Sequence, residues 1–125
     1  MNRDVVSTDQ APAAIGPYSQ AVRVGDFLFC SGQIPLRPDG TVETGDVRDQ
    51  TEQVMRNIHA VLSAAGLDFS KVVKTTIYLS SMDHFAAVNE IYGSRFSSAP
   101  PARSTVAVAG LPKGVDVEIE VLAAF

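Results

Sequence analysis

The chain has 125 residues, a length typical of one domain, and 46% of them are hydrophobic, enough to bury a substantial core. Its net charge of −4, with scattered Lys and Arg, argues against a nucleic-acid groove, because phosphate binding requires clustered positive charge. The single cysteine excludes an intramolecular disulfide and a zinc site built on paired cysteines, and no apolar run approaches the roughly 20 residues of a membrane span.

The N-terminal part of the chain predicts two strands joined by a prolyl loop. Residues 1–4 lack the basic-then-apolar pattern of a signal peptide, so we expect a cytoplasmic protein. A short strand is expected at residues 4–6. The loop at residues 12–20 then brings Tyr18 to the start of a strand at residues 21–24.

The middle of the chain alternates between strand and helix signals. Gly25-Asp26 suits a two-residue hairpin turn, after which residues 27–32 return as a strand. Apolar residues at three- and four-residue steps predict a helix over residues 46–65. Residues 72–79 are rich in β-branched side chains, which favour a strand, and a second helix is expected over residues 82–96.

The predicted order is strand, strand, strand, helix, strand, helix, strand, strand, within a single domain over residues 1–125. Two helices can cover only one face of such a sheet. The strands at residues 27–32 and 72–79 nevertheless carry apolar side chains on both faces. We therefore expect another copy of the chain to cover the second face.

The last quarter of the chain carries the most informative charged residues. Carboxylates alternate with apolar residues in the final strand, so Glu118 and Glu120 share one face. If residues 110–114 close a hairpin, Arg103 lies opposite or diagonal to these glutamates. That pairing predicts either an ion pair on a solvated face, worth about 0–1 kcal/mol, or an anion site. In the anion site Arg103 binds a substrate carboxylate and a glutamate transfers a proton. Spacing alone does not distinguish Glu118 from Glu120 as that acid.

Five segments together resemble motifs of one family. They are, in chain order, Ala11-Pro12-Ala13-Ala14-Ile15-Gly16-Pro17-Tyr18-Ser19-Gln20, Ser31-Gly32-Gln33-Ile34-Pro35, Asn89-Glu90-Ile91-Tyr92, Pro101-Ala102-Arg103-Ser104 and Leu111-Pro112-Lys113-Gly114-Val115-Asp116-Val117-Glu118-Ile119-Glu120. In register from about Ala11 to Ala123, they resemble the RidA (YjgF) family.

The resemblance implies an α+β, chorismate-mutase-like fold, a mixed sheet with two helices on one face. Three subunits would pack their sheets into a central barrel, with sites in the clefts between subunits. It also implies hydrolytic deamination of reactive 2-imino and enamino acids, such as 2-iminopropanoate and 2-iminobutanoate, to 2-oxo acids and ammonia. This chemistry requires no metal or organic cofactor, and we expect neither a nucleic-acid nor a membrane partner.

The resemblance also assigns roles to individual residues. Arg103 matches the carboxylate-binding arginine, and Glu118 matches the acid that holds the water and assists proton transfer. The matched pocket-lining residues are Tyr18, Ser31, Gly32 and Asn89. Thr105 stands where some relatives have a cysteine that is not the nucleophile. Its backbone could still contact substrate or water, but thiol-dependent regulation at this position is in doubt.

Two other functions fit the same sequence. One is a non-catalytic binding module for small carboxylates that uses Arg103, and the other is a translation-associated, ribonuclease-like role ascribed to some relatives. Cys30 could be proposed as a nucleophile, but no histidine is placed to activate it, so we expect an inert buried thiol. His59 and His84 lie in separate helical segments without ligand spacing, and we expect structural roles for both.

Overall fold

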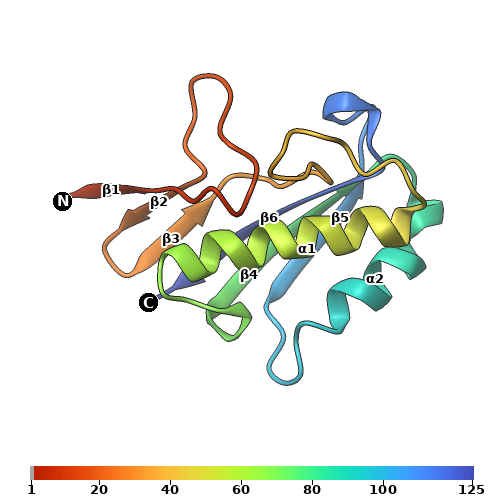
Figure 1. Ribbon diagram of the computed structural model, residues 1–125. Coiled ribbons are helices and arrows are strands. Elements are labelled where there is room, and N and C mark those ends of the chain that lie inside the picture. Colours follow the sequence, from red (N-terminus) through yellow and green to blue (C-terminus); the bar gives the residue numbers. More distant parts are fainter. Residues whose placement is uncertain (1) are drawn as a thin grey trace.

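The computed structural model describes residues 2–125 (Figure 1). The expected order of strands and helices is confirmed. In chain order they are β1 (Arg3–Val6), β2 (Ala21–Val24), β3 (Phe27–Cys30), α1 (Val47–Ala64), β4 (Val72–Leu79), α2 (Phe85–Gly93), β5 (Ala102–Ala107) and β6 (Val117–Ala124). Short 3-10 helices, η1 (Phe69–Lys71), η2 (Met82–His84) and η3 (Pro112–Gly114), precede β4, α2 and β6.

Helix α1 begins and ends where its flanking residues stop the helical hydrogen bonding. The Asp46 carboxylate accepts hydrogen bonds from the backbone N–H groups of Arg48 (2.9 Å) and Asp49 (3.0 Å), which the first helical turn leaves free. At the other end Gly66 adopts φ +76°, a conformation that favours glycine and commonly terminates helices. Between these caps one side of the helix is buried against the sheet.

Replacing Asp46 with alanine should lower the free energy of unfolding by about 1 kcal/mol, because two backbone N–H groups lose their acceptor. Urea denaturation followed by circular dichroism measures this loss. Asp4→Ala is the matched control, since Asp4 is an exposed aspartate on the edge strand β1. Equal losses in the two variants would rule out the capping explanation.

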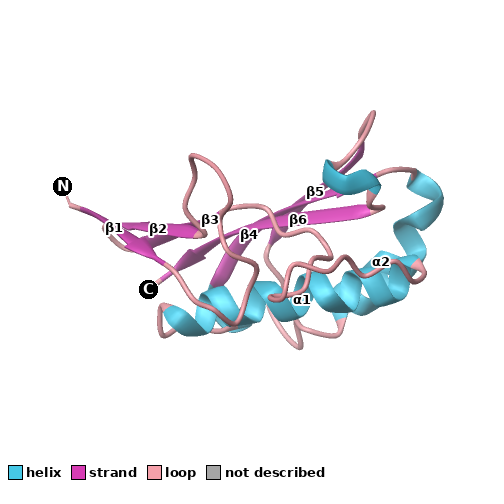
Figure 2. Cartoon of the chain, turned by 45° about the horizontal axis from the view of Figure 1, so that its top comes forward, coloured by secondary structure: helices cyan, strands magenta, loops and turns pink. Residues whose placement is uncertain are grey.

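The strands form a single mixed sheet in the order β1-β2-β3-β6-β4-β5. Only β4 and β5 are parallel neighbours, and the other adjacent pairs are antiparallel. Both α-helices lie on the same side of the sheet (Figure 2). The core is the layer between them, where Leu28, Ile77 and Ile119 from the sheet are almost completely buried. The predicted α+β fold with helices on one face is therefore confirmed.

The predicted hairpin between the last two strands is wrong, because β4 lies between β5 and β6. Helix α2 forms a crossover that returns the chain parallel to β4 on its outer edge. The other edge of β4 is then free for β6, which pairs with it along nearly its full length. Residues 108–116 do reverse the chain, but they cross the end of β4 instead of closing a tight turn (Figure 1).

This strand order separates the arginine from the glutamates. Arg103 is paired in register with Thr75 of β4, on the face covered by the helices, where the Thr75 hydroxyl reaches α2. Glu118 is paired with Tyr78, and because side chains alternate along β4 it lies on the opposite face. The cross-strand proximity of Arg103 to Glu118 and Glu120, expected from the sequence, does not occur within one chain.

The face away from the helices is apolar over much of its area. Val5, Phe27, Phe29 and Val106 lie there by strand register, with exposed fractions of 59%, 44%, 52% and 44%. No segment among residues 2–125 covers this face with a second layer (Figure 2). Of the helices in the same residues, none combines the length and apolar character that crossing a membrane requires.

Candidate functional site

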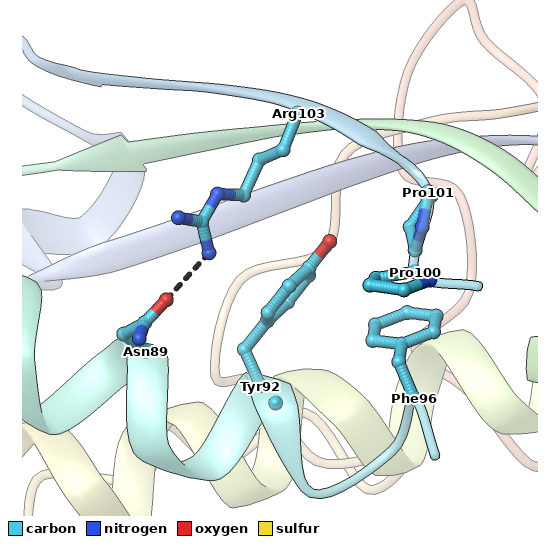
Figure 3. Close-up of a pocket in the computed structure, with 7 residues that line it drawn as sticks. Asn89, Tyr92, Phe96, Pro100, Pro101 and Arg103 are labelled. Carbon is cyan, nitrogen blue, oxygen red and sulfur yellow. Dashed lines mark hydrogen bonds between the residues drawn. The ribbon is translucent and has the colours of Figure 1, made fainter. Parts of the chain in front are cut away.

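Arg103 lies on the edge strand β5 with its side chain directed toward α2 (Figure 3). Its Nη1 donates a hydrogen bond of 2.6 Å to Oδ1 of Asn89. The guanidinium carbon lies 5.2 Å from the ring centroid of Tyr92 and 5.5 Å from that of Phe85, within cation–π range. No Asp or Glu among residues 2–125 forms a salt bridge with Arg103. A neutral amide and two aromatic rings therefore position the guanidinium and leave its charge available to an anion.

The ring of Tyr92 is itself fixed in place. Its hydroxyl shares a buried hydrogen bond of 2.8 Å with Oγ1 of Thr75, the residue paired with Arg103 in the sheet. The roles implied by the sequence motifs do not include Tyr92 or Phe85. The sequence does contain a signal that places them beside Asn89. Phe85, Asn89 and Tyr92 are spaced four and three residues apart, so a helix presents all three on one face.

A cavity of about 430 Å³ adjoins Arg103, between α2 and the segment that leads into β5. That segment turns at Ala99, a non-glycine residue with φ +45°, in a region that is strained for L-residues. The turn delivers Pro100-Pro101 to the mouth of the cavity, where Pro100 faces the Phe96 ring (Figure 3). Besides Arg103, the lining residues are Asn89, Tyr92, Gly93, Phe96, Pro100 and Pro101.

Tyr18, Ser31 and Gly32 form a separate group around the end of β3. The Ser31 hydroxyl donates a hydrogen bond of 2.5 Å to the backbone carbonyl of Ser19. The backbone N–H of Ser31 donates a second hydrogen bond, of 2.9 Å, to the backbone carbonyl of Gln20. These bonds attach the prolyl loop to the strand end. Tyr18 is 55% exposed, and its hydroxyl accepts only a long hydrogen bond of 3.4 Å from the Ile15 N–H. Most of its ring remains available for contact.

Gln20 organises that loop, although sequence analysis assigned it no role. Its buried side-chain amide accepts a hydrogen bond of 2.7 Å from the Thr8 N–H and donates to the carbonyls of Thr8 (3.0 Å) and Pro12 (2.8 Å). A polar residue at the start of an apolar strand was the only available signal. Gln20 therefore ties the loop that carries Tyr18 to β2.

Glu118 belongs to the same group through its contact with Gly32. A Cβ atom on Gly32 would overlap Oε2 of Glu118, so a larger residue at position 32 would force this carboxylate to move from the place it occupies here. Burial, and secondarily the charge of Glu120, raises the pKa of Glu118 above its ordinary value. Within residues 2–125 the Glu118 carboxylate has no salt-bridge partner. A desolvated carboxyl group with a raised pKa keeps its proton to a higher pH than an exposed one does, which suits a group that accepts and returns a proton.

Glu120 has a different environment on the same face. Its Oε1 accepts a hydrogen bond of 3.0 Å from the Tyr78 hydroxyl, and this bond is the main cause of the raised pKa of Tyr78. Glu120 is therefore already engaged by a neighbouring side chain. The two glutamates that sequence spacing left open therefore differ in environment, Glu120 being hydrogen-bonded to Tyr78 and Glu118 lying against Gly32.

Thr105 lies two residues beyond Arg103 and faces the same side of the sheet. Its Oγ1 is buried, and no atom among residues 2–125 forms a hydrogen bond with it. An unsatisfied buried hydroxyl costs roughly 1–3 kcal/mol. Because this oxygen atom is buried, the structure does not present the Thr105 side chain to the cavity beside Arg103.

Cys30 is half-buried at the end of β3. Burial raises the pKa of its thiol to about 12, so the nucleophilic thiolate is negligible at neutral pH. His59 stacks on Phe69 with ring centroids 6.0 Å apart, and His84 Nε2 lies 3.7 Å from a carboxylate oxygen of Asp116. Residues 2–125 contain no group of three or more potential metal ligands.

The residues assigned from the resemblance thus fall into two groups within one chain. Arg103, Asn89 and Thr105 lie on the helix-covered side beside the sheet edge formed by β5. The second group surrounds the end of β3, and its carboxylate points to the opposite face of the sheet. Its members are Tyr18, Ser31, Gly32 and Glu118. A single chain does not bring the two groups together.

Comparison with known proteins identifies the family. A family model described as "Endoribonuclease L-PSP" matches residues 8–125. The chain belongs to this family, the RidA (YjgF) family. The resemblance found in the sequence motifs is therefore confirmed.

Individual RidA-family members match over nearly the whole chain. "Protein DfrA" of Myxococcus xanthus is 57% identical over 98% of this chain and 96% of its own length. The "2-iminobutanoate/2-iminopropanoate deaminase" of Mus musculus is 49% identical, covering 97% of this chain and 90% of its own. A solved structure of a Rid-family protein of unknown function from Yersinia pestis is 48% identical with a TM-score of 0.97, covering 99% and 100% of the two chains. Family membership and the similarity to the mouse deaminase support an enzyme that deaminates reactive intermediates.

Proposed function

We propose that the protein hydrolyses small 2-imino acids, such as 2-iminopropanoate and 2-iminobutanoate, to 2-oxo acids and ammonia. The observation that carries this proposal is the state of Arg103. Its guanidinium lines a cavity, is oriented by the amide of Asn89, and has no carboxylate partner among residues 2–125. A planar guanidinium can bind the substrate carboxylate through two parallel hydrogen bonds, which a lysine cannot reproduce.

In the proposed reaction, Glu118 orients a water molecule toward C2 of the bound imine. The water oxygen forms a bond to C2 as the electron pair of the C=N bond moves to nitrogen, and Glu118 accepts a proton from the water. The carboxyl group then gives this proton to the nitrogen. Glu118 then takes the proton of the new hydroxyl and passes it to the amino nitrogen, so that the C=O bond forms as the C–N bond of the tetrahedral carbinolamine breaks, releasing ammonia and the 2-oxo acid. The raised pKa of Glu118 favours this proton exchange.

We further propose that the active sites form between subunits of a homotrimer. Two observations support this arrangement. Arg103 and Glu118 lie on opposite faces of the sheet in one chain, so a shared site requires a second copy. The sheet face that carries Glu118 also exposes Phe29 and Val106, whose burial by another copy would be favourable.

The direct test generates 2-iminopropanoate in situ with a serine-dehydrating enzyme. We expect the added protein to accelerate pyruvate release above the spontaneous rate of hydrolysis. The alternative of a non-catalytic carboxylate-binding module predicts binding of pyruvate without any acceleration. The family name, Endoribonuclease L-PSP, raises the further alternative of RNA cleavage. An RNA-cleavage assay run in parallel addresses it, and the net charge of −4 predicts no cleavage.

Replacing Gly32 with alanine should lower the rate of imine hydrolysis about 100-fold, because the added methyl group displaces the Glu118 carboxylate. Steady-state kinetics of the purified variant measure the effect. Gly110→Ala is the matched control, since a Cβ atom there meets nothing within 4 Å. Wild-type rates in Gly32→Ala would show that the position of Glu118 is immaterial.

A further inference from the structure

The end of β6 that carries Glu118 has little support on one of its two edges. Strand β4 pairs with β6 along nearly its full length, whereas β3 pairs only with residues 122–124. Toward Glu118 that edge is held by a single bridge, in which the backbone N–H groups of Gln33 and Ile119 donate hydrogen bonds of 2.9 and 3.1 Å to each other's carbonyls. The position of Glu118 therefore also depends on what fixes the residue just before β6, which is Asp116.

Asp116 is held by two segments at once. On one side is Gln50 of α1, whose Oε1 accepts a hydrogen bond of 2.9 Å from the Asp116 N–H and whose Nε2 donates one of 3.0 Å to Oδ2 of Asp116. On the other side is Ser80, directly after β4, whose N–H donates to the Asp116 carbonyl at 3.0 Å and whose hydroxyl donates to Oδ1 at 2.8 Å. Both backbone groups and both carboxylate oxygens of Asp116 are thus engaged.

Gln50 suits this contact because an amide presents a donor and an acceptor side by side. The residue is buried, and its Nε2 also donates a hydrogen bond of 3.2 Å to the backbone carbonyl of Gly45, just before α1. A buried amide with these partners is restricted to one orientation. Its hydrogen bonds therefore tie the start of β6 to the start of α1, which the Asp46 cap fixes in turn.

We propose that Gln50 is a positioning residue for Glu118. By holding Asp116, it keeps the start of β6 in the place that sets the Glu118 carboxylate against Gly32. Asp116 lies two residues before Glu118, so the backbone carries a shift of one residue to the other. The effect of Gln50 on turnover rests on the proposed function, whereas its effect on the place of Glu118 does not.

Gln50→Glu tests this role, because a carboxylate cannot donate to the Asp116 carboxylate and repels it. We expect kcat for 2-iminopropanoate to fall at least about tenfold, since a misplacement of roughly 1 Å can cost about 100-fold in rate. The affinity for pyruvate, which Arg103 binds, should stay unchanged in calorimetric titration. Gln53→Glu is the matched control and should keep the wild-type kcat. Gln53 is equally buried on α1, but its Nε2 donates to Asn57 of the same helix.

A second substitution should restore the contact. Asp116→Asn in the Gln50→Glu background exchanges the two groups, so the amide at position 116 donates to the carboxylate at position 50, and its oxygen accepts from the Ser80 hydroxyl. We expect kcat to return to near the wild-type value. A folded Gln50→Glu variant with wild-type kcat, or a loss that Asp116→Asn leaves unrepaired, would overturn the proposal.

Thermal unfolding shows whether each variant is folded. If Gln50→Glu does not fold, Ser80→Ala decides, because it removes one hydrogen bond to Asp116 from an exposed residue. A lower kcat with unchanged affinity for pyruvate then supports the proposal, and a wild-type kcat overturns it.

The carboxyl carbon resonance of Glu118 reports its surroundings without any turnover. It is assigned in protein labelled with carbon-13 glutamate as the signal that Glu118→Gln removes. The resonance should shift in Gln50→Glu, return with Asp116→Asn, and stay in place in Gln53→Glu. If it behaves in this way but the wild type hydrolyses no imine, the positioning role stands and the proposed function fails. If the wild type is active and Gln50→Glu changes neither the resonance nor kcat, the positioning role fails and the function stands.

Discussion

Replacing Arg103 with alanine should lower kcat/KM for 2-iminopropanoate at least about 100-fold, or close to 3 kcal/mol in transition-state free energy. The substrate carboxylate would lose its charged hydrogen-bonding partner, and the neighbouring Asn89 and Tyr92 cannot replace it. Arg103→Lys is the matched control. It keeps the charge but not the planar pair of donors, so we expect partial activity with a raised KM.

The measurement is initial-rate kinetics with imine generated in situ, together with gel filtration and thermal unfolding of each variant. Within residues 2–125 Arg103 donates one hydrogen bond to another side chain, so its loss should leave the fold and the proposed oligomer intact. Activity near the wild-type level in a folded Arg103→Ala variant would remove this residue from the mechanism.

Replacing Glu118 with glutamine should lower kcat by about 100-fold to 10,000-fold, the contribution typical of general acid–base catalysis. Glutamine has nearly the same shape and still fills the space beside Gly32, so binding of pyruvate should persist. Glu120→Gln is the matched control on the same face. Because Glu120 is engaged by the Tyr78 hydroxyl, its substitution should cost much less activity. A larger loss in Glu120→Gln than in Glu118→Gln would reverse the assignment of the two glutamates.

The stability of the Glu118→Gln variant provides an independent check through its pH dependence. The pKa of Glu118 is raised in the folded protein above the ordinary value of 4.5, so the folded state binds this proton more tightly than the unfolded state does. As pH rises through the window above 4.5, ionisation of Glu118 therefore destabilises the wild type. Glutamine does not ionise, and the variant should gain stability relative to wild type across that window. Denaturation midpoints measured at several pH values would show this gain.

Local patterns in the sequence predicted the elements and their faces. The alternation of carboxylates in β6, the helix expected over residues 46–65 and the hairpin turn at Gly25-Asp26 depend on residues close together in the chain, and the structure agrees with each. The pairing of the last strands depends instead on which edge of β4 each one occupies. Adjacency in sequence favoured a β5–β6 hairpin, but the α2 crossover places β5 on one edge of β4 and leaves the other to β6.

In the candidate site, too, individual residues could be predicted from motifs, whereas contacts that depend on how distant segments pack could not. The motifs identified Arg103 and Asn89, which the structure brings into contact through α2 and β5. Sequence analysis did not predict the aromatic surroundings of Arg103, because Tyr92 and Phe85 have the spacing of ordinary core residues on an amphipathic helix. The predicted β5–β6 hairpin also placed Arg103 and Glu118 close together within one chain, but β4 lies between these two strands. The structure separates these two residues, and an active site that contains both requires two copies of the chain.

Subunit complementation tests this requirement most directly. Arg103→Ala and Glu118→Gln are co-expressed with different affinity tags, and mixed oligomers are purified through both tags. In any mixed ring of three, one junction of the three pairs an intact Arg103 with an intact Glu118, so about a third of the wild-type activity should return. Mixed oligomers as inactive as either parent variant would contradict a site shared between subunits.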